Sequence, residues 1–372
     1  MKINLKLLPA IILFIIISCS NGTQNNILPI NKGEDPNNLV INGQTFRYTA
    51  MVYVLNETTT IIGSDNSWNK YMSEEHKDKG IFAKGNTITL SPYAICKYEV
   101  TEELYDTVMG RVVSKNRYIH RPAQSVSWYD AITFCNKLSL LCDKTPCYTV
   151  EGVDNWAVFN PSDVPTENNQ LWNETFCDMS ADGYRLPTEA EWEFAARGGN
   201  PTAKDWEYAY SGIQSSKMVF IDNTVDDDDY ICRYLIDETA DYAQNRYNNV
   251  YLEYLLYDDN LDKVAVYDGY NINEYNQRIP NKSFNYLQIV GSKNCNRLGL
   301  YDMTGNSEEW CWDLYGTSSS RICKGGSCRN LAFNCIVSRR NHEPAYKHYD
   351  LDIIYKYGWG VLGFRIAQTI TK

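Results

Sequence analysis

Residues 184–199 read YRLPTEAEWEFAARGG, and this stretch contains the clearest helix start and stop signals in the chain. Thr188 is followed three residues later by Glu191, which is the capping-box pattern of a helix N-terminus. Trp192 supplies an apolar residue inside the helix, and the Gly198-Gly199 pair is typical of a helix end. The stretch therefore predicts a short helix that begins after Thr188.

Two further helix starts follow from the same kind of local signal. Thr101 precedes an acidic first turn with apolar spacing behind it, and Gly110 marks the stop. Ser127 is followed three residues later by Asp130, which is a capping box with Asp in place of Glu. Apolar residues on one face predict that this helix runs to about Ser139.

The opening stretch is one of several segments that occur in a characteristic order along the chain. Some of them are long and specific, so a chance agreement in both content and order is not credible. The segments are KYEVT at 97–101, VSWYDAITFCN at 126–136, the stretch at 184–199, LGLYDMTGN at 298–306 with EW at 309–310, KGGS at 324–327, NC at 334–335 and GFR at 363–365.

This series resembles the formylglycine-generating-enzyme (sulfatase-modifying-factor) family from about residue 51 to residue 367. The resemblance implies a single large α+β domain, a variant of the C-type lectin fold that is poor in regular secondary structure. Short apolar runs at 51–55 and 88–90 agree with this fold class because they predict short strands. Residues 213–285 match the family poorly, and they are predicted to be an enlarged acidic insertion.

The N-terminus predicts export and a lipid anchor. A basic start precedes an apolar run at residues 7–17, which is too short to span a bilayer but suits a signal peptide. The run ends in Ser18 and Cys19, which resembles a bacterial lipobox with Cys19 as the lipidated residue, although Ile17 is bulkier than usual. The alternative is a plain signal peptide with a chance cysteine. We predict a signal peptide at 1–19, a polar tether at 20–40 and one domain at 41–372, giving a membrane-anchored lipoprotein of the periplasm or cell surface.

Composition restricts the partners. The net charge of −11 repels phosphate backbones, so nucleic acid is not expected to bind. The 29 Tyr and 9 Trp can supply either contact area for a ligand or core in a loop-rich fold. After Cys19, 11 cysteines remain, which is an odd number, and their spacing does not give a disulfide pairing, although Cys142 and Cys147 are close enough in sequence to bridge.

The resemblance implies a calcium site in the turn after the LGLYD segment. Family members bind Ca²⁺ there through main-chain oxygens and one glutamate, and hard oxygen ligands suit this ion. Glu308 replaces a tryptophan that is usual in the family, and the alternative is a turn without metal. The matching positions are Asp302, Gly305, Ser307 and Glu309.

The resemblance also implies where an oxidase centre would lie, and here the chain departs from the family. The enzymes hold copper(I) with two cysteines, three and eight residues past the serine of the KGGS segment. Cys335 stands at the second position after Ser327, but Asn330 stands at the first. Cys328 lies two residues before Asn330, about 6.6 Å along a strand, so it is not expected to complete the pair. We therefore do not expect copper; in an active enzyme Cys335 and Ser327 would be catalytic.

The leading hypothesis is a non-catalytic lipoprotein that binds a protein or glycan ligand. Some relatives with one cysteine resemble surface proteins diversified by retroelements near the C-terminus. Residues 328–357 fit such display, although Glu343 and Lys347 do not fit adenine-directed mutation. The runner-up is a formylglycine-generating oxidase with an altered copper site, and an iron enzyme would need a histidine cluster that the sequence lacks. The predicted ligand contacts are Cys328, Asn330, Tyr346, His348, Tyr349 and Trp359.

Overall fold

The structure is a computed structural model, and it describes most of the chain from residue 35 onward. Cys19, most of the predicted tether, Tyr349 and Trp359 lie outside them, and every structural statement below concerns the described residues. They are 35–64, 80–110, 118–212, 219–222, 224–226, 229–231, 252–255, 261–267, 270–272, 278–280, 286–316, 319–330, 332–348 and 361–371.

The three helices predicted from capping signals are confirmed as α1 (Glu102–Val108), α2 (Trp128–Leu141) and α4 (Glu189–Ala196). Both predicted capping boxes are complete, because the side chains of Ser127 and Thr188 each accept a backbone N–H at N3 while the N3 carboxylate accepts the N-cap N–H. The remaining helices are short: α3 (Gln170–Asn173), α5 (Leu261–Val264), and three turns of 3-10 helix at Pro161–Asp163, Lys204–Glu207 and Ala332–Cys335.

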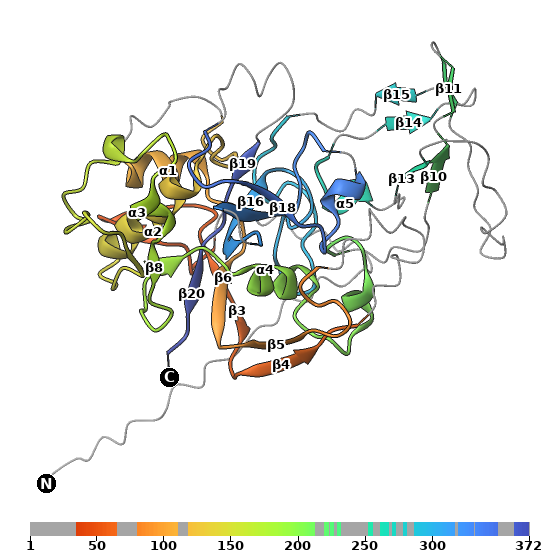
Figure 1. Ribbon diagram of the computed structural model, residues 1–372. Coiled ribbons are helices and arrows are strands. Elements are labelled where there is room, and N and C mark those ends of the chain that lie inside the picture. Colours follow the sequence, from red (N-terminus) through yellow and green to blue (C-terminus); the bar gives the residue numbers. More distant parts are fainter. Residues whose placement is uncertain are drawn as a thin grey trace, which may run out of the picture.

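Two four-stranded sheets organise the described part of the domain (Figure 1). The first has the order β3 (Met51–Leu55), β6 (Tyr93–Cys96), β20 (Ala367–Thr369), β9 (Tyr184–Arg185), with every pair antiparallel. The second has the order β18 (Asn341–Pro344), β17 (Ser320–Lys324), β16 (Glu308–Leu314), β19 (Leu362–Gly363), and only its β16–β19 pair is parallel. Since the C-terminal strand β20 lies between β6 and β9, chain segments far apart in sequence meet in one sheet.

The other strands form antiparallel pairs, and the predicted strand at 51–55 is confirmed as β3. Three pairs, β10–β13, β11–β12 and β14–β15, come from the predicted insertion, and Figure 1 shows them on the side of the domain opposite α2 and α3. The pairs are β1 (Val40–Ile41) with β2 (Gln44–Thr45), β4 (Thr59–Ile62) with β5 (Thr87–Leu90), β7 (Tyr148–Thr149) with β8 (Phe176–Cys177), β10 (Val219–Asp222) with β13 (Leu252–Leu255), β11 (Thr224–Asp226) with β12 (Asp229–Ile231), and β14 (Tyr270–Ile272) with β15 (Arg278–Pro280).

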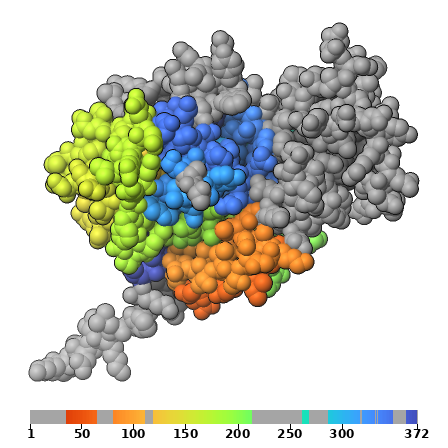
Figure 2. Space-filling view, viewed as in Figure 1, coloured from red at the N-terminus to blue at the C-terminus, as the bar shows by residue number. Residues whose placement is uncertain are grey.

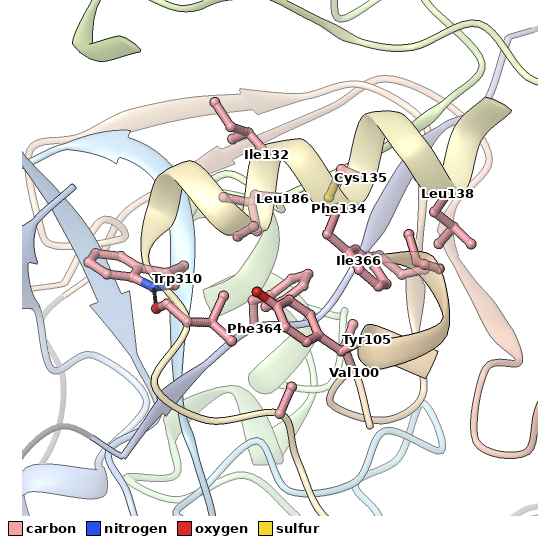
Figure 3. Packing of buried hydrophobic residues seen from close by; sticks show 14 of the residues in the cluster. Val100, Tyr105, Ile132, Phe134, Cys135, Leu138, Leu186, Trp310, Phe364 and Ile366 are labelled. Atoms are coloured by element: carbon pink, nitrogen blue, oxygen red, sulfur yellow. Dashed lines mark hydrogen bonds between the residues drawn. The ribbon is translucent and has the colours of Figure 1, made fainter. Parts of the chain in front are cut away.

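The second sheet separates two hydrophobic cores. Alternate residues of a strand point to opposite faces, and accordingly Trp310 and Cys323 pack in the core around α2, while Cys311 and Ile322 pack in the core around α4. Figure 3 shows the first core, in which one face of α2 meets Trp310 and Phe364. The tryptophans of the described chain are all buried or partly buried, so much of the aromatic content serves as core. No helix among the described residues has the length and apolar character needed to cross a membrane.

Candidate functional site

The turn predicted to bind calcium contains a buried ion pair. The Glu309 carboxylate accepts hydrogen bonds from Arg365 at both oxygens, with 2.6 Å to Nε and 2.6 Å to Nη2, and neither side chain is exposed. Trp192 Nε1 donates a third hydrogen bond to Glu309 Oε2 at 2.7 Å. The paired carboxylate outweighs burial and raises the pKa of Arg365, so the guanidinium stays charged. Glu309 therefore already has a counter-charge without any metal ion.

Two further carboxylates lie beside this pair. Glu99, which the sequence did not indicate as a site residue, accepts hydrogen bonds from Ser307 N at 2.8 Å and from Asn306 Nδ2 at 2.6 Å. Asp302 accepts a hydrogen bond from Gly291 N at 2.6 Å. Burial raises the pKa of Glu99 well above its usual range, and the charges of Asp302 and Glu309 add to the shift. The turn thus brings together three buried carboxylates and one guanidinium.

The residues of this turn fit a calcium ion only in part. Carboxylate and main-chain oxygens are the hard ligands that Ca²⁺ prefers, and Gly305 is needed because an added Cβ would lie 2.1 Å from Val266 O. Against this, the Glu309 carboxylate is already engaged by Arg365 and Trp192. Calcium binding through Asp302, Gly305, Ser307 and Glu309 stays a prediction.

The oxidase positions lie in a tightly packed corner. Cys335 ends the 3-10 turn Ala332–Cys335, is fully buried, and has its Sγ 3.8 Å from Ser327 O, to which it can donate. An added Cβ on Gly326 would lie 2.7 Å from the Cys335 sulfur. Burial raises the pKa of the Cys335 thiol, and the charge of Glu308 raises it further. The thiolate, which is the form that binds copper(I), is therefore disfavoured.

Asn330, which replaces the other cysteine, holds the turn that leads to Cys335. Its Oδ1 accepts hydrogen bonds from Ser327 N at 2.8 Å and from Ser327 Oγ at 2.9 Å. Its own backbone N–H donates to Ser327 O at 3.0 Å. The side-chain oxygen is thus part of a closed local network, in which Ser327 and Asn330 support one another.

Cys328, predicted as a ligand contact, is instead fully buried, in a small cluster with Val266, Leu287 and Val361. Cys335 packs in the core around α4. Asn330 provides no thiolate, so the two-cysteine spacing of the family enzymes is not reproduced, although Cys328 is close enough to Cys335 for its charge to add to the raised pKa of that thiol.

The predicted ligand-binding segment is described between residues 341 and 348. His342 is exposed on strand β18, and its ring stacks on Tyr315 with centroids 3.9 Å apart. Tyr346 is partly buried against the core around α2, and His348 contacts Asp130 across 2.5 Å. Tyr315 was not predicted because it directly follows β16 (Glu308–Leu314), and only the pairing of β16, β17 and β18 brings it to this surface.

Glu308, the residue at the family's tryptophan position, lies near Asn341 and Glu343, on the face of β18 opposite His342. It is partly buried, and Asn341 Nδ2 donates a hydrogen bond to its Oε2 at 3.1 Å. Burial raises the pKa of Glu308 to about 7, and the charge of Glu343 adds to the shift while the Asn341 hydrogen bond opposes it.

Comparison with known proteins agrees with this fold. Residues 32–369 match the family model described as the sulfatase-modifying factor enzyme 1-like domain, so the chain belongs to this family and has its α+β fold. It is 33% identical over 244 residues to the chaperone protein LppX of Paenibacillus barcinonensis, covering 64% of this chain and 70% of that protein. It is also similar to the structure of Treponema denticola variable protein 1, with 26% identity and a TM-score of 0.57, covering 84% of this chain and 95% of that one.

Proposed function

We propose that this chain is a non-catalytic member of its family that binds a protein or glycan ligand. The observation that carries the proposal is Asn330 at the position of the missing cysteine. Its side-chain oxygen is used twice within the turn, at 2.8 Å and 2.9 Å from Ser327 N and Oγ. An amide is a poor ligand for soft copper(I), and here it stabilises a turn. The oxidase mechanism of the family requires a second cysteine, and this chain has Asn330 at that position.

The relatives support a binding role. One is called a chaperone and another a variable protein, and neither name refers to an oxidase. A chaperone acts on polypeptides, which favours a protein ligand for the present chain as well. The matches extend over most of the length of both relatives, so the comparison concerns whole domains and not a shared motif.

The binding surface that we propose is formed by residues 341–348 together with Tyr315. Tyr315 is 37% exposed and lies flat on His342, which gives a rigid aromatic platform. Aromatic groups supply large contact area at low conformational cost, and interfaces are enriched in them. Asn341 and Glu343 alternate with His342 along β18 and face the other side of the strand, where Asn341 donates a hydrogen bond to Glu308. Cys19 would anchor the protein in a membrane outside the cytoplasm, so that the surface meets extracytoplasmic ligands.

A copper titration and a substrate assay test the non-catalytic reading. The wild-type protein should bind copper(I) weakly and leave a sulfatase-type cysteine peptide unoxidised, as judged by mass spectrometry of the peptide. Asn330→Cys should raise the copper(I) affinity by a large factor because it adds a second thiolate, whereas the matched control Asn330→Asp should not. Copper-dependent turnover by the wild-type chain would overturn the proposal and establish the alternative, an oxidase with an altered copper site that uses Cys335.

A second experiment tests the surface itself. The wild-type protein and the double variant Tyr315→Ala/His342→Ala should be compared on arrays of extended peptides and of glycans. We expect the wild type to bind a subset of probes and the variant to lose that subset with an unchanged melting temperature, since both side chains are exposed. Equal binding by both proteins would place the ligand elsewhere.

A further inference from the structure

The segment that carries the proposed binding surface is docked on the first turn of α2, more than two hundred residues earlier in the chain. Trp128 N and Tyr129 N, the first two backbone donors of α2, donate hydrogen bonds to Ala345 O at 2.9 Å and 3.3 Å. Ala345 itself is only 1% exposed, although Lys347 nearby is exposed. The carbonyl of Ala345 therefore satisfies helix donors that otherwise have no partner within α2.

A contact between two side chains lies beside these backbone bonds. His348 Nε2 is 2.5 Å from Asp130 Oδ2, where the Asp130 side chain is 4% exposed and the His348 side chain is 33% exposed. The same Oδ2 atom accepts Ser127 N at 3.1 Å and Ser127 Oγ at 2.9 Å in the capping box of α2. One buried carboxylate oxygen thus contacts both the N-terminus of α2 and the docked segment.

We propose that Asp130 and His348 form a positioning pair that fixes residues 345–348 on α2 and so sets the orientation of the binding surface. Strand pairing to β17 holds the segment at residues 341–344, and the pair holds its other end. A hydrogen bond to a charged group is stronger than a neutral one, and a buried carboxylate strengthens it further. The inference rests on the proposed function in one respect, namely that this surface binds a ligand. The contacts that dock the segment on α2 form without any ligand.

Hydrogen exchange with mass-spectrometric detection tests the pair, because local opening of a docked segment sets its exchange rate. Two peptides of the full-length protein are informative, one covering 127–130 and one covering 341–348. His348→Ala should accelerate exchange in both peptides by about tenfold or more, the loss expected for a charge-assisted hydrogen bond. His348→Gln should restore most of the protection because its side-chain amide can still donate to Asp130. His342→Ala, a histidine of the same segment that stacks on Tyr315, is the matched control and should leave the 127–130 peptide unchanged.

Acceleration confined to these two peptides and reversed by Gln supports the pair. Exchange at the wild-type rate in His348→Ala would overturn it, and so would acceleration across the whole protein, which indicates general destabilisation. Because no ligand is present in this experiment, its failure leaves the binding proposal standing. Conversely, a surface that binds no probe leaves the positioning pair intact.

Discussion

Removing the charge of Glu309 should destabilise the domain strongly, and the geometry sets the size of the effect. In Glu309→Gln the side chain keeps its shape, and Trp192 Nε1 can still donate to the amide oxygen. Arg365, however, loses both charged acceptors at 2.6 Å while it remains fully buried. Breaking a buried ion pair by removing one partner costs roughly 3–5 kcal/mol because the other charge is left uncompensated. We expect the free energy of unfolding to fall by that amount.

Urea-induced unfolding, followed by tryptophan fluorescence, measures this change, and it should be recorded both with calcium and with a chelator. Glu57→Gln is the matched control because Glu57 is exposed, and it should change the free energy of unfolding by less than about 0.5 kcal/mol. The double variant Glu309→Met/Arg365→Met should recover much of the loss, since apolar replacement of a whole buried pair is often neutral.

Two results would contradict this reasoning. A loss below about 1 kcal/mol in Glu309→Gln would mean that the pair with Arg365 contributes little. A large loss in calcium that vanishes in the chelator would mean that Glu309 acts as a metal ligand and that Arg365 has another partner when the ion is bound. An equal loss in both conditions is the outcome that the geometry supports.

Three other predictions concern calcium, pH and the membrane anchor. If the turn around Gly305 binds Ca²⁺, chelation should lower the melting temperature of the wild-type protein; identical curves exclude a stabilising ion. Because burial raises the pKa of Glu308 to about 7, its protonated form favours the folded state, and this contribution should be lost as pH rises from about 4.5 through about 7. Glu308→Gln should therefore reduce the difference in unfolding free energy between about pH 5 and about pH 8, measured in urea. Cys19→Ala should abolish partition into a detergent phase; a soluble wild-type protein would contradict lipidation.

The parts of the fold that could be predicted were those encoded within a few residues. The capping boxes at Ser127 and Thr188 place donor and acceptor three residues apart, so the sequence contains the whole hydrogen-bond pattern. The short strand at 51–55 was visible as an apolar run. Sheet order was not visible, because β20 pairs with β6 and β9 from distant parts of the chain.

The site could be predicted only as a set of positions. The absence of the second cysteine was evident at Asn330, but the bonds of Asn330 to Ser327 depend on how the turn closes. Cys328 was expected at the surface, and only the packing of Val266 and Val361 around it explains its burial. Likewise, His348 was predicted as a ligand contact, while its partner Asp130 lies 218 residues away in sequence.

The segments that identify the family turn out to be held together by buried polar contacts. Glu99 of the first segment accepts hydrogen bonds from Asn306 and Ser307, and Trp192 of the opening stretch donates to Glu309, which also pairs with Arg365 of the GFR segment. Buried polar groups must be satisfied for the fold to be stable, so these contacts contribute to the stability of this chain. The two positions needed for copper, by contrast, contribute little to this network. A chain can therefore keep most of the family's segments while one of the two cysteine positions differs, which is why the proposed function depends on Asn330 more than on the extent of the resemblance.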